Sequence, residues 1–126
     1  MPNILKVKLT TTTPISVDID QNNGANHVSQ SPNSQTISWQ LEDNAATGSF
    51  VDFHFLPNQT PDPAGIFGPP DYGPNNKSLS ISDTNNSSST AGSWTYFLKI
   101  RVNNQDYSTT STSPILVSNN PTIKNM

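Results

Sequence analysis

The sequence predicts an all-β fold, because three features recur along its length. Apolar and polar residues alternate in short segments, the pattern of a strand with one buried face. Turn-forming Asn, Gly, Pro and Ser residues separate these segments. Helix-forming residues are few, whereas β-branched and aromatic residues are concentrated in the alternating segments. Together these features predict an antiparallel, immunoglobulin-like β-sandwich of about seven to nine strands.

Each expected strand is marked by apolar residues two positions apart, which would share the core-facing side of a sheet. In chain order the predicted core-facing sets are Leu5, Val7 and Leu9; Ile15, Val17 and Ile19; Ile37, Trp39 and Leu41; Val51, Phe53 and Phe55; Leu79 and Ile81; Trp94, Tyr96, Leu98, Ile100 and Val102; and Ile115 with Val117. The Asn23–Gly24 and Asn103–Asn104 pairs are expected at hairpin turns, since these residues tolerate positive φ.

Two segments depart from the alternating pattern. Residues 57–77 contain six prolines, and proline cannot donate a backbone hydrogen bond inside a sheet. We expect this loop to fold over one end of the sandwich with Phe67 as a plug; the alternative is a binding loop. Residues 83–93 are polar and are expected to form a loop. A short C-terminal strand is expected at 121–125, and the whole chain, 1–126, is expected to form a single domain.

Composition disfavours several functional classes. The net charge of −3 provides no basic patch for nucleic acid. The chain has no cysteine, which removes disulfides, thiolate zinc sites and thiol catalysis. No segment is long and apolar enough for a membrane helix, and no signal peptide is visible, so the default expectation is a cytoplasmic protein.

A metal site and a hydrolase triad are not predicted. Asp18, Asp20 and Asn22 resemble the start of a calcium loop, but the glycine comes one place late and the twelfth position is Ser29 instead of glutamate. His27 and His54 have no partner at metal-binding spacing, and no serine stands in a nucleophile elbow. We therefore expect neither a metal nor a cofactor.

Lys99 stands in the middle of the longest predicted strand, on the face opposite Leu98 and Ile100. In the simpler interpretation it is a solvated lysine on an exposed sheet face. In the alternative it lies beside Phe97 and Phe50 under a covering segment, where desolvation would favour the neutral, nucleophilic amine.

Asn120–Pro121 provides a matching electrophile near the C-terminus. Because proline has no N–H, attack by the following backbone nitrogen is closed, and the Asn120 side chain can instead attack its own backbone carbonyl. That reaction cuts the chain before Pro121, and Lys99 could open the resulting ring. Alternatively, Lys99 attacks the Asn120 carboxamide directly and expels ammonia. Either route needs a proton carrier, for which Asp52 is the preferred candidate, with Glu42 and His54 behind it.

These residues resemble the bacterial DP-EP family, small cysteine-free β-sandwich proteins regarded as self-cleaving and self-assembling endopeptidases. The resemblance covers chain size, the absence of cysteine, the Lys99 strand and the tail from Pro121 to Lys124. It implies cleavage close to the C-terminus, retention of the short C-terminal piece as a strand, and a bond between the strand lysine and the new terminal residue.

Position 120 is asparagine where the family has aspartate, which leaves three alternatives. The protein forms only a Lys99–Asn120 cross-link, or it is an inactive member, or it is a variant altered to block the cut. The expected function is therefore self-processing at Asn120–Pro121 with Lys99 as acceptor, and the expected partner is the protein itself. The alternative function is a binding or structural module, such as a carbohydrate-binding, adhesin-like or self-assembling subunit that forms homo-oligomers through its sheet edges.

Overall fold

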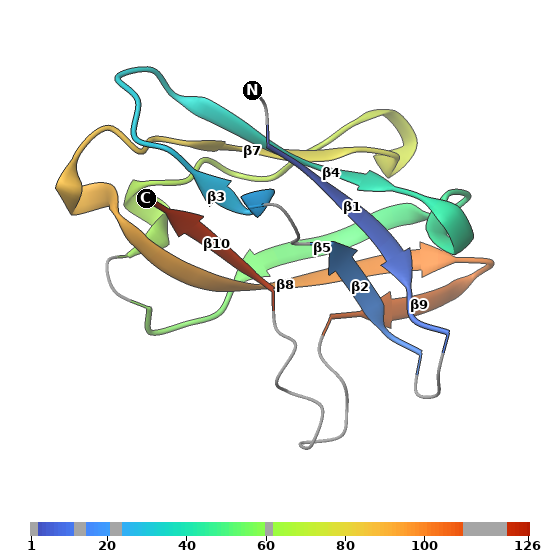
Figure 1. Cartoon of the computed structure of the whole chain (residues 1–126). Coiled ribbons are helices and arrows are strands. Elements are labelled where there is room, and N and C mark those ends of the chain that lie inside the picture. The colour runs from blue at the N-terminus through green and yellow to red at the C-terminus, as the bar shows by residue number, and fades with distance from the viewer. Residues whose placement is uncertain (1–2, 12–14, 21–23, 60–61, 110–120) are drawn as a thin grey trace.

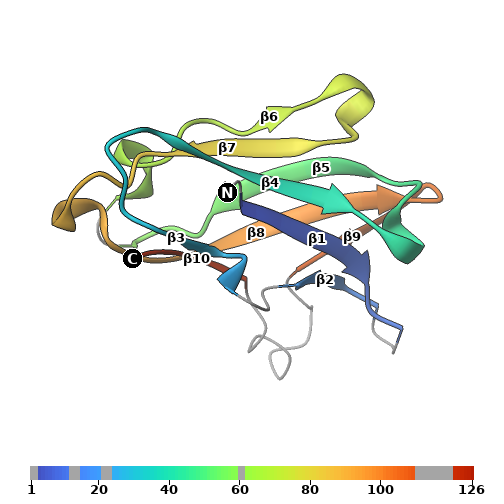
Figure 2. The same ribbon diagram turned by 45° about the horizontal axis from the view of Figure 1, so that its top comes forward.

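The computed structural model describes residues 3–11, 15–20, 24–59, 62–109 and 121–126. Two five-stranded sheets pack face to face as a sandwich (Figures 1 and 2). The strands of the first sheet are, in spatial order, β2 (Val17–Asp20), β1 (Asn3–Leu9), β4 (Gln35–Leu41), β7 (Leu79–Asp83) and β6 (Asp71–Tyr72). Those of the second are β3 (His27–Val28), β10 (Thr122–Asn125), β8 (Gly92–Val102) and β5 (Ser49–Phe55), with β9 (Gln105–Ser108) also paired to β8.

The helical segments among the described residues are single 3₁₀ turns in the connections. They include η2 (Asp43–Ala45), η3 (Pro63–Gly65), η4 (Pro74–Asn76) and η5 (Ser88–Thr90). None of these described helices is long and apolar enough to span a membrane.

The prediction of a sandwich is confirmed, but the prediction of purely antiparallel sheets is wrong. Strand β1 runs parallel to β4, with Leu5 opposite Trp39, and β10 runs parallel to β3, with Lys124 opposite His27. Both sheets are therefore mixed. The ten strands of the described residues exceed the predicted number because β3 and β6 are two-residue strands, too short to show alternation in a sequence.

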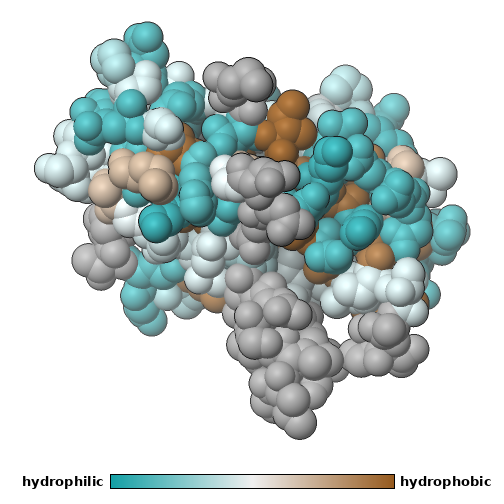
Figure 3. All heavy atoms as spheres, viewed as in Figure 1, coloured by the Kyte–Doolittle hydropathy of each residue, from teal (hydrophilic) through white to brown (hydrophobic). Residues whose placement is uncertain are grey.

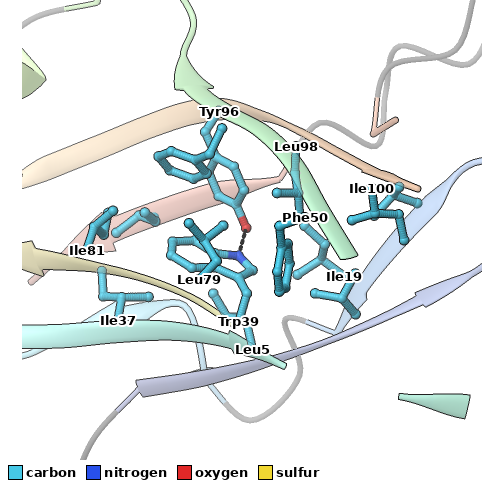
Figure 4. Close-up of a cluster of buried hydrophobic side chains, with 14 of the residues drawn as sticks. Leu5, Ile19, Ile37, Trp39, Phe50, Leu79, Ile81, Tyr96, Leu98 and Ile100 are labelled. Carbon is cyan, nitrogen blue, oxygen red and sulfur yellow. Dashed lines mark hydrogen bonds between the residues drawn. The ribbon is translucent and has the colours of Figure 1, made fainter. Parts of the chain in front are cut away.

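Alternating side chains from the two sheets meet in one core, as predicted for most strands. At its centre Trp39 of the first sheet and Tyr96 of the second are both buried, and the Trp39 Nε1–H donates a hydrogen bond to the Tyr96 hydroxyl at 2.9 Å (Figure 4). Phe53 packs against both rings, at centroid distances of 5.0 Å from Trp39 and 5.1 Å from Tyr96. This aromatic cluster joins the two sheets.

Two predicted core residues lie at the surface instead. Ile15 is 45% exposed and precedes β2, so the buried face of that strand begins at Val17. Val51 is 36% exposed because β5 carries a β-bulge between Phe50 and Asp52. The bulge inserts one residue into the alternation, which buries Phe50 completely while Phe53 remains in the core.

The proline-rich loop closes one side of the sandwich, and the predicted plug is confirmed. Phe67 is buried, forms an isolated bridge with Asp83, and lies 4.8 Å from the ring of Phe55 and 5.1 Å from that of Trp94. Farther along the loop, η4 contacts the edge strand β5, and Lys77 Nζ donates a hydrogen bond to the Gly48 carbonyl, just before β5 begins, at 2.7 Å. The loop therefore covers part of an edge that would otherwise be free to pair with another chain.

The hairpin between β8 and β9 turns at Asn103 and Asn104, as predicted. Both residues have positive φ, 53° and 65°, as a two-residue type I′ turn requires. Gly24 also has positive φ, 68°, whereas its neighbour Asn23 lies outside the described residues. The predicted strand around Ile115 and Val117 likewise lies outside them.

Candidate functional site

The site predicted from the sequence centres on β8, the strand that receives the C-terminal strand. Strand β10 pairs antiparallel with β8, with Thr122 opposite Thr95, and the Tyr96 N–H donates to the Pro121 carbonyl oxygen at 3.1 Å. On its other edge β10 bonds to the β3 segment, where the Lys124 N–H donates to the Asn26 carbonyl at 2.9 Å. The chain from Pro121 onward is thus an inner strand of the second sheet.

Lys99 also lies on β8, three residues after Tyr96, the residue that is hydrogen-bonded to Pro121. Three residues span about 10 Å along a β-strand. It is half-buried on the outward face, opposite Asp52 of β5 on one side and Ser108 of β9 on the other. The expectation that Phe50 lies beside Lys99 is wrong. The β5 bulge turns Phe50 into the core, opposite Ile100.

Asp52 and His54 project from the same outward face of β5, as their spacing predicts. The His54 Nδ1 and an Asp52 carboxylate oxygen lie 3.0 Å apart, and the His54 ring stacks on Phe97 of β8 with centroids 4.8 Å apart. Both side chains remain about half exposed, at 54% for His54 and 48% for Asp52. Across the β5–β8 pair, Asp52 lies opposite Lys99 and His54 lies opposite Phe97.

Asp52 also affects the pKa of Tyr72, a residue of the proline-rich loop. Burial raises the pKa of Tyr72, and the negative charge of Asp52 raises it further. Tyr72 thus remains neutral, and its half-buried ring packs against the core.

Two other predicted site residues, Glu42 and Asn120, are not among the side chains described beside Lys99. Glu42 follows the end of β4 in the first sheet, where its N–H donates to the Val7 carbonyl at 2.9 Å. Lys99 lies on β8 in the second sheet, so Glu42 is not among the side chains beside Lys99. Asn120 lies outside the described residues. The next residue, Pro121, is described and is buried.

Farther along the outward face of β8, Arg101 is paired with Asp106 of β9. Its Nε donates to an Asp106 carboxylate oxygen at 2.7 Å. This hydrogen bond and the positive charge of Arg101 hold the pKa of Asp106 below its usual range. The guanidinium is therefore already occupied, and Lys99 is the cation of β8 beside Asp52.

A second polar cluster, which the sequence analysis missed, is buried near the C-terminus. Asp83 was assigned to a polar loop, but it ends β7 and is fully buried. Asn125 of β10 donates through its Nδ2 to an Asp83 carboxylate oxygen at 3.0 Å and to the Thr90 carbonyl at 2.8 Å. The signal was present in the alternation, because Asp83 continues the core-facing series of Leu79 and Ile81, and Asn125 that of Ile123.

Elsewhere in the fold, the described residues include a surface hollow but no metal-binding group. A hollow at the end of β1, between Lys8, Asp18 and Asn44, contains none of the predicted site residues. Within the described ranges no three His, Asp or Glu side chains form a group that could hold a metal ion. The outward surface seen in Figure 3 is mainly hydrophilic, with apolar residues showing between polar ones.

Comparison with known proteins gives no assignment: no protein-family model, no curated protein and no solved structure matches this chain.

Proposed function

We propose that this domain processes itself at the Asn120–Pro121 junction, with Lys99 as the acceptor amine, in the manner of the DP-EP proteins that it resembles. The immunoglobulin-like strand topology is part of the same proposal. The substrate is the protein's own chain, and the reaction requires no cofactor.

The observation that carries the proposal is the register of the C-terminal strand. The Pro121 carbonyl oxygen accepts a hydrogen bond from the Tyr96 N–H of β8. Lys99, which would react with the neighbouring Asn120, lies on the same strand. A fixed strand register restricts the encounter between two groups, which is how proteins make an otherwise inert amide reactive. The four-carbon side chain of Lys99 gives its amine further reach along this face.

Two routes follow from the residue at position 120. In the cross-linking route the neutral Lys99 Nζ attacks the Asn120 side-chain carbonyl carbon, an amide bond forms, and ammonia leaves with the transferred proton. In the cleavage route the Asn120 side-chain nitrogen attacks its own backbone carbonyl carbon, and the Pro121 nitrogen leaves as a protonated amine. The cyclic imide that remains is opened by the Lys99 amine, which joins Lys99 to residue 120 through an amide bond.

Asp52 and His54 are the proton carriers in this proposal. Asp52 is the cross-strand neighbour of Lys99, so its carboxylate can accept a proton from the ammonium or the attacking amine. His54 is hydrogen-bonded to Asp52 and about half exposed, and it can pass that proton to solvent. Glu42, in the first sheet, takes no part in the proposed proton transfer.

After a cut before Pro121 the C-terminal piece would remain bound. Ile123 is fully buried, which by itself stabilises the docked strand by about 1.5–3 kcal/mol. Backbone hydrogen bonds on both edges of β10 add to this. A cleaved protein would therefore keep its fold, and separation of the fragments requires denaturation.

The test is the intact mass of the protein under denaturing conditions. A separate fragment of residues 121–126 supports cleavage, and a full-length chain lighter by one ammonia supports cross-linking. Lys99→Arg should abolish the cross-link. The matched control is Lys124→Arg, because Lys124 is an exposed lysine on β10 and takes no part in either route. An unmodified mass for the wild-type protein after prolonged incubation would refute the proposal.

A further inference from the structure

The buried cluster around Asp83 holds two oxygen atoms that have no hydrogen-bond partner among the described residues. They are Asp83 Oδ2 and Asn125 Oδ1, and both belong to side chains that are almost completely inaccessible to solvent. A buried acceptor without a donor costs about 1–3 kcal/mol, so native structures rarely retain one, let alone two in contacting side chains. This pair of atoms needs an explanation.

Reversing the Asn125 amide does not provide it. The Asn125 nitrogen lies 2.8 Å from the Thr90 carbonyl oxygen and 3.0 Å from Asp83 Oδ1, and both of these atoms accept hydrogen bonds. Exchanging the amide nitrogen and oxygen would place an oxygen against two acceptors. The two amide hydrogens are therefore both used, and the amide oxygen must find a donor elsewhere.

A proton on Asp83 would supply that donor. A carboxylic acid and a carboxamide in contact can pair through two hydrogen bonds, N–H to the acid carbonyl and O–H to the amide oxygen. The first of these bonds is present at 3.0 Å. The second would use the two atoms that otherwise have no partner.

Among the residues that the structure describes, no cation is paired with Asp83. The elements packed against it contribute Gln35 of β4, Phe67 of the proline-rich loop, Thr90 of η5 and Asn125 of β10, all uncharged. On β10 the charged residue next to Asn125 is Lys124, which is exposed. Burial in this setting raises the pKa of Asp83 to about 6, against the opposing effect of the Asn125 hydrogen bond.

We propose that Asp83 is a proton-binding site in the folded domain, and that its proton latches the C-terminal strand β10 to β7 by completing the acid–amide pair with Asn125. The latch does not depend on the processing reaction at Asn120–Pro121, since it acts on the docked strand whether or not the chain is cut. Loss of the proton leaves a buried carboxylate facing an amide oxygen and weakens the attachment of β10.

The sign of the pH effect follows from the direction of the shift. The folded state binds the proton more tightly than the unfolded chain, whose aspartate titrates near 3.8. The contribution of Asp83 to stability is therefore largest below about pH 4, falls as the pH rises through about 6, and is constant above it. A shift from 3.8 to about 6 corresponds to a change of about a hundredfold in the folding equilibrium constant.

The decisive variant is Asp83→Asn, because an amide at this position keeps the shape and can form both hydrogen bonds at every pH. Urea unfolding of the wild type and of this variant should be compared between pH 4 and 8. We expect the difference between the two proteins to change by about a hundredfold in the equilibrium constant over this range, with the variant favoured at pH 8. Asp71→Asn, at an exposed position of β6, is the control and should show no such change. A constant difference between the wild type and Asp83→Asn would overturn the proposal.

A second measurement does not depend on the variant folding. The Asp83 side-chain carboxyl carbon can be followed by NMR in the labelled wild-type protein as the pH is raised. A titration midpoint near 6 supports a protonated Asp83 at mildly acidic pH. A midpoint at or below the ordinary aspartate value would contradict it.

Discussion

The hydrogen bond between Trp39 and Tyr96 gives the sharpest prediction about stability, and the variant that tests it is Tyr96→Phe. The bond joins the two sheets at 2.9 Å through side chains that are 2% and 0% exposed, so water cannot replace either partner. Removing the hydroxyl leaves the indole N–H buried without an acceptor. We expect a loss of about 1–3 kcal/mol in the free energy of unfolding, which includes both the bond and the cost of the unpaired donor.

The assay is urea unfolding followed by tryptophan fluorescence and circular dichroism, with the thermal midpoint as a second readout. For a domain of this size 1 kcal/mol corresponds to roughly 3–6 °C, so a decrease of about 5–15 °C is expected. The matched control is Tyr107→Phe, because Tyr107 is a half-buried tyrosine of β9 at the margin of the core. That variant should change stability by less than about 0.5 kcal/mol.

Equal stability of Tyr96→Phe and Tyr107→Phe would refute this prediction. The double variant with Trp39→Phe adds a stricter criterion. The loss caused by Tyr96→Phe should be smaller by at least about 0.5–1 kcal/mol when Trp39 is already phenylalanine, because no donor is then left unpaired. Purely additive losses would show that the bond does not stabilise the core.

Three further predictions address the reaction and the backbone. Asp52→Asn should slow Lys99-dependent processing by about 10²–10⁴-fold in a time course of intact mass, whereas an unchanged rate would remove Asp52 as the proton carrier. Gly48→Ala should lower the free energy of unfolding by about 1–3 kcal/mol, since an added Cβ would lie 2.6 Å from the Arg101 carbonyl oxygen. A neutral effect would mean that the backbone can shift to make room for the methyl group. Asn104 has a φ of 65°, so Asn104→Ala should lower the free energy of unfolding by about 1 kcal/mol, whereas Asn104→Gly should not. Equal stability of the two variants would argue against a left-handed conformation at this turn.

Much of the fold could be predicted from local pattern alone. Alternation identified the buried faces around Leu5, Trp39 and Tyr96, and the apolar character of Phe67 indicated that the proline-rich loop would close over the core. What failed depends on pairing between distant segments. A bulge such as the one beside Val51 shifts the alternation by one residue, and a parallel pairing such as that of β1 with β4 leaves no mark in either strand.

The candidate site was predictable only in part, for a similar reason. Asp52 and His54 share a strand face, so their proximity follows from spacing, and the longest strand had to contain Lys99 in its middle. That Asp52 is the cross-strand neighbour of Lys99 follows from the register of β5 on β8, which the bulge sets. The buried acid Asp83 was missed because a single polar residue at an inward position looks like the start of a loop.

The most direct test of the proposed reaction is a search for a branched peptide in a tryptic digest of the denatured protein, analysed by tandem mass spectrometry. The proposed reaction should give one peptide in which the side chain of Lys99 is joined to residue 120, with no tryptic cleavage after Lys99. It would be contradicted by linear peptides alone, in which Lys99 carries a free amine and the Asn120–Pro121 bond is intact.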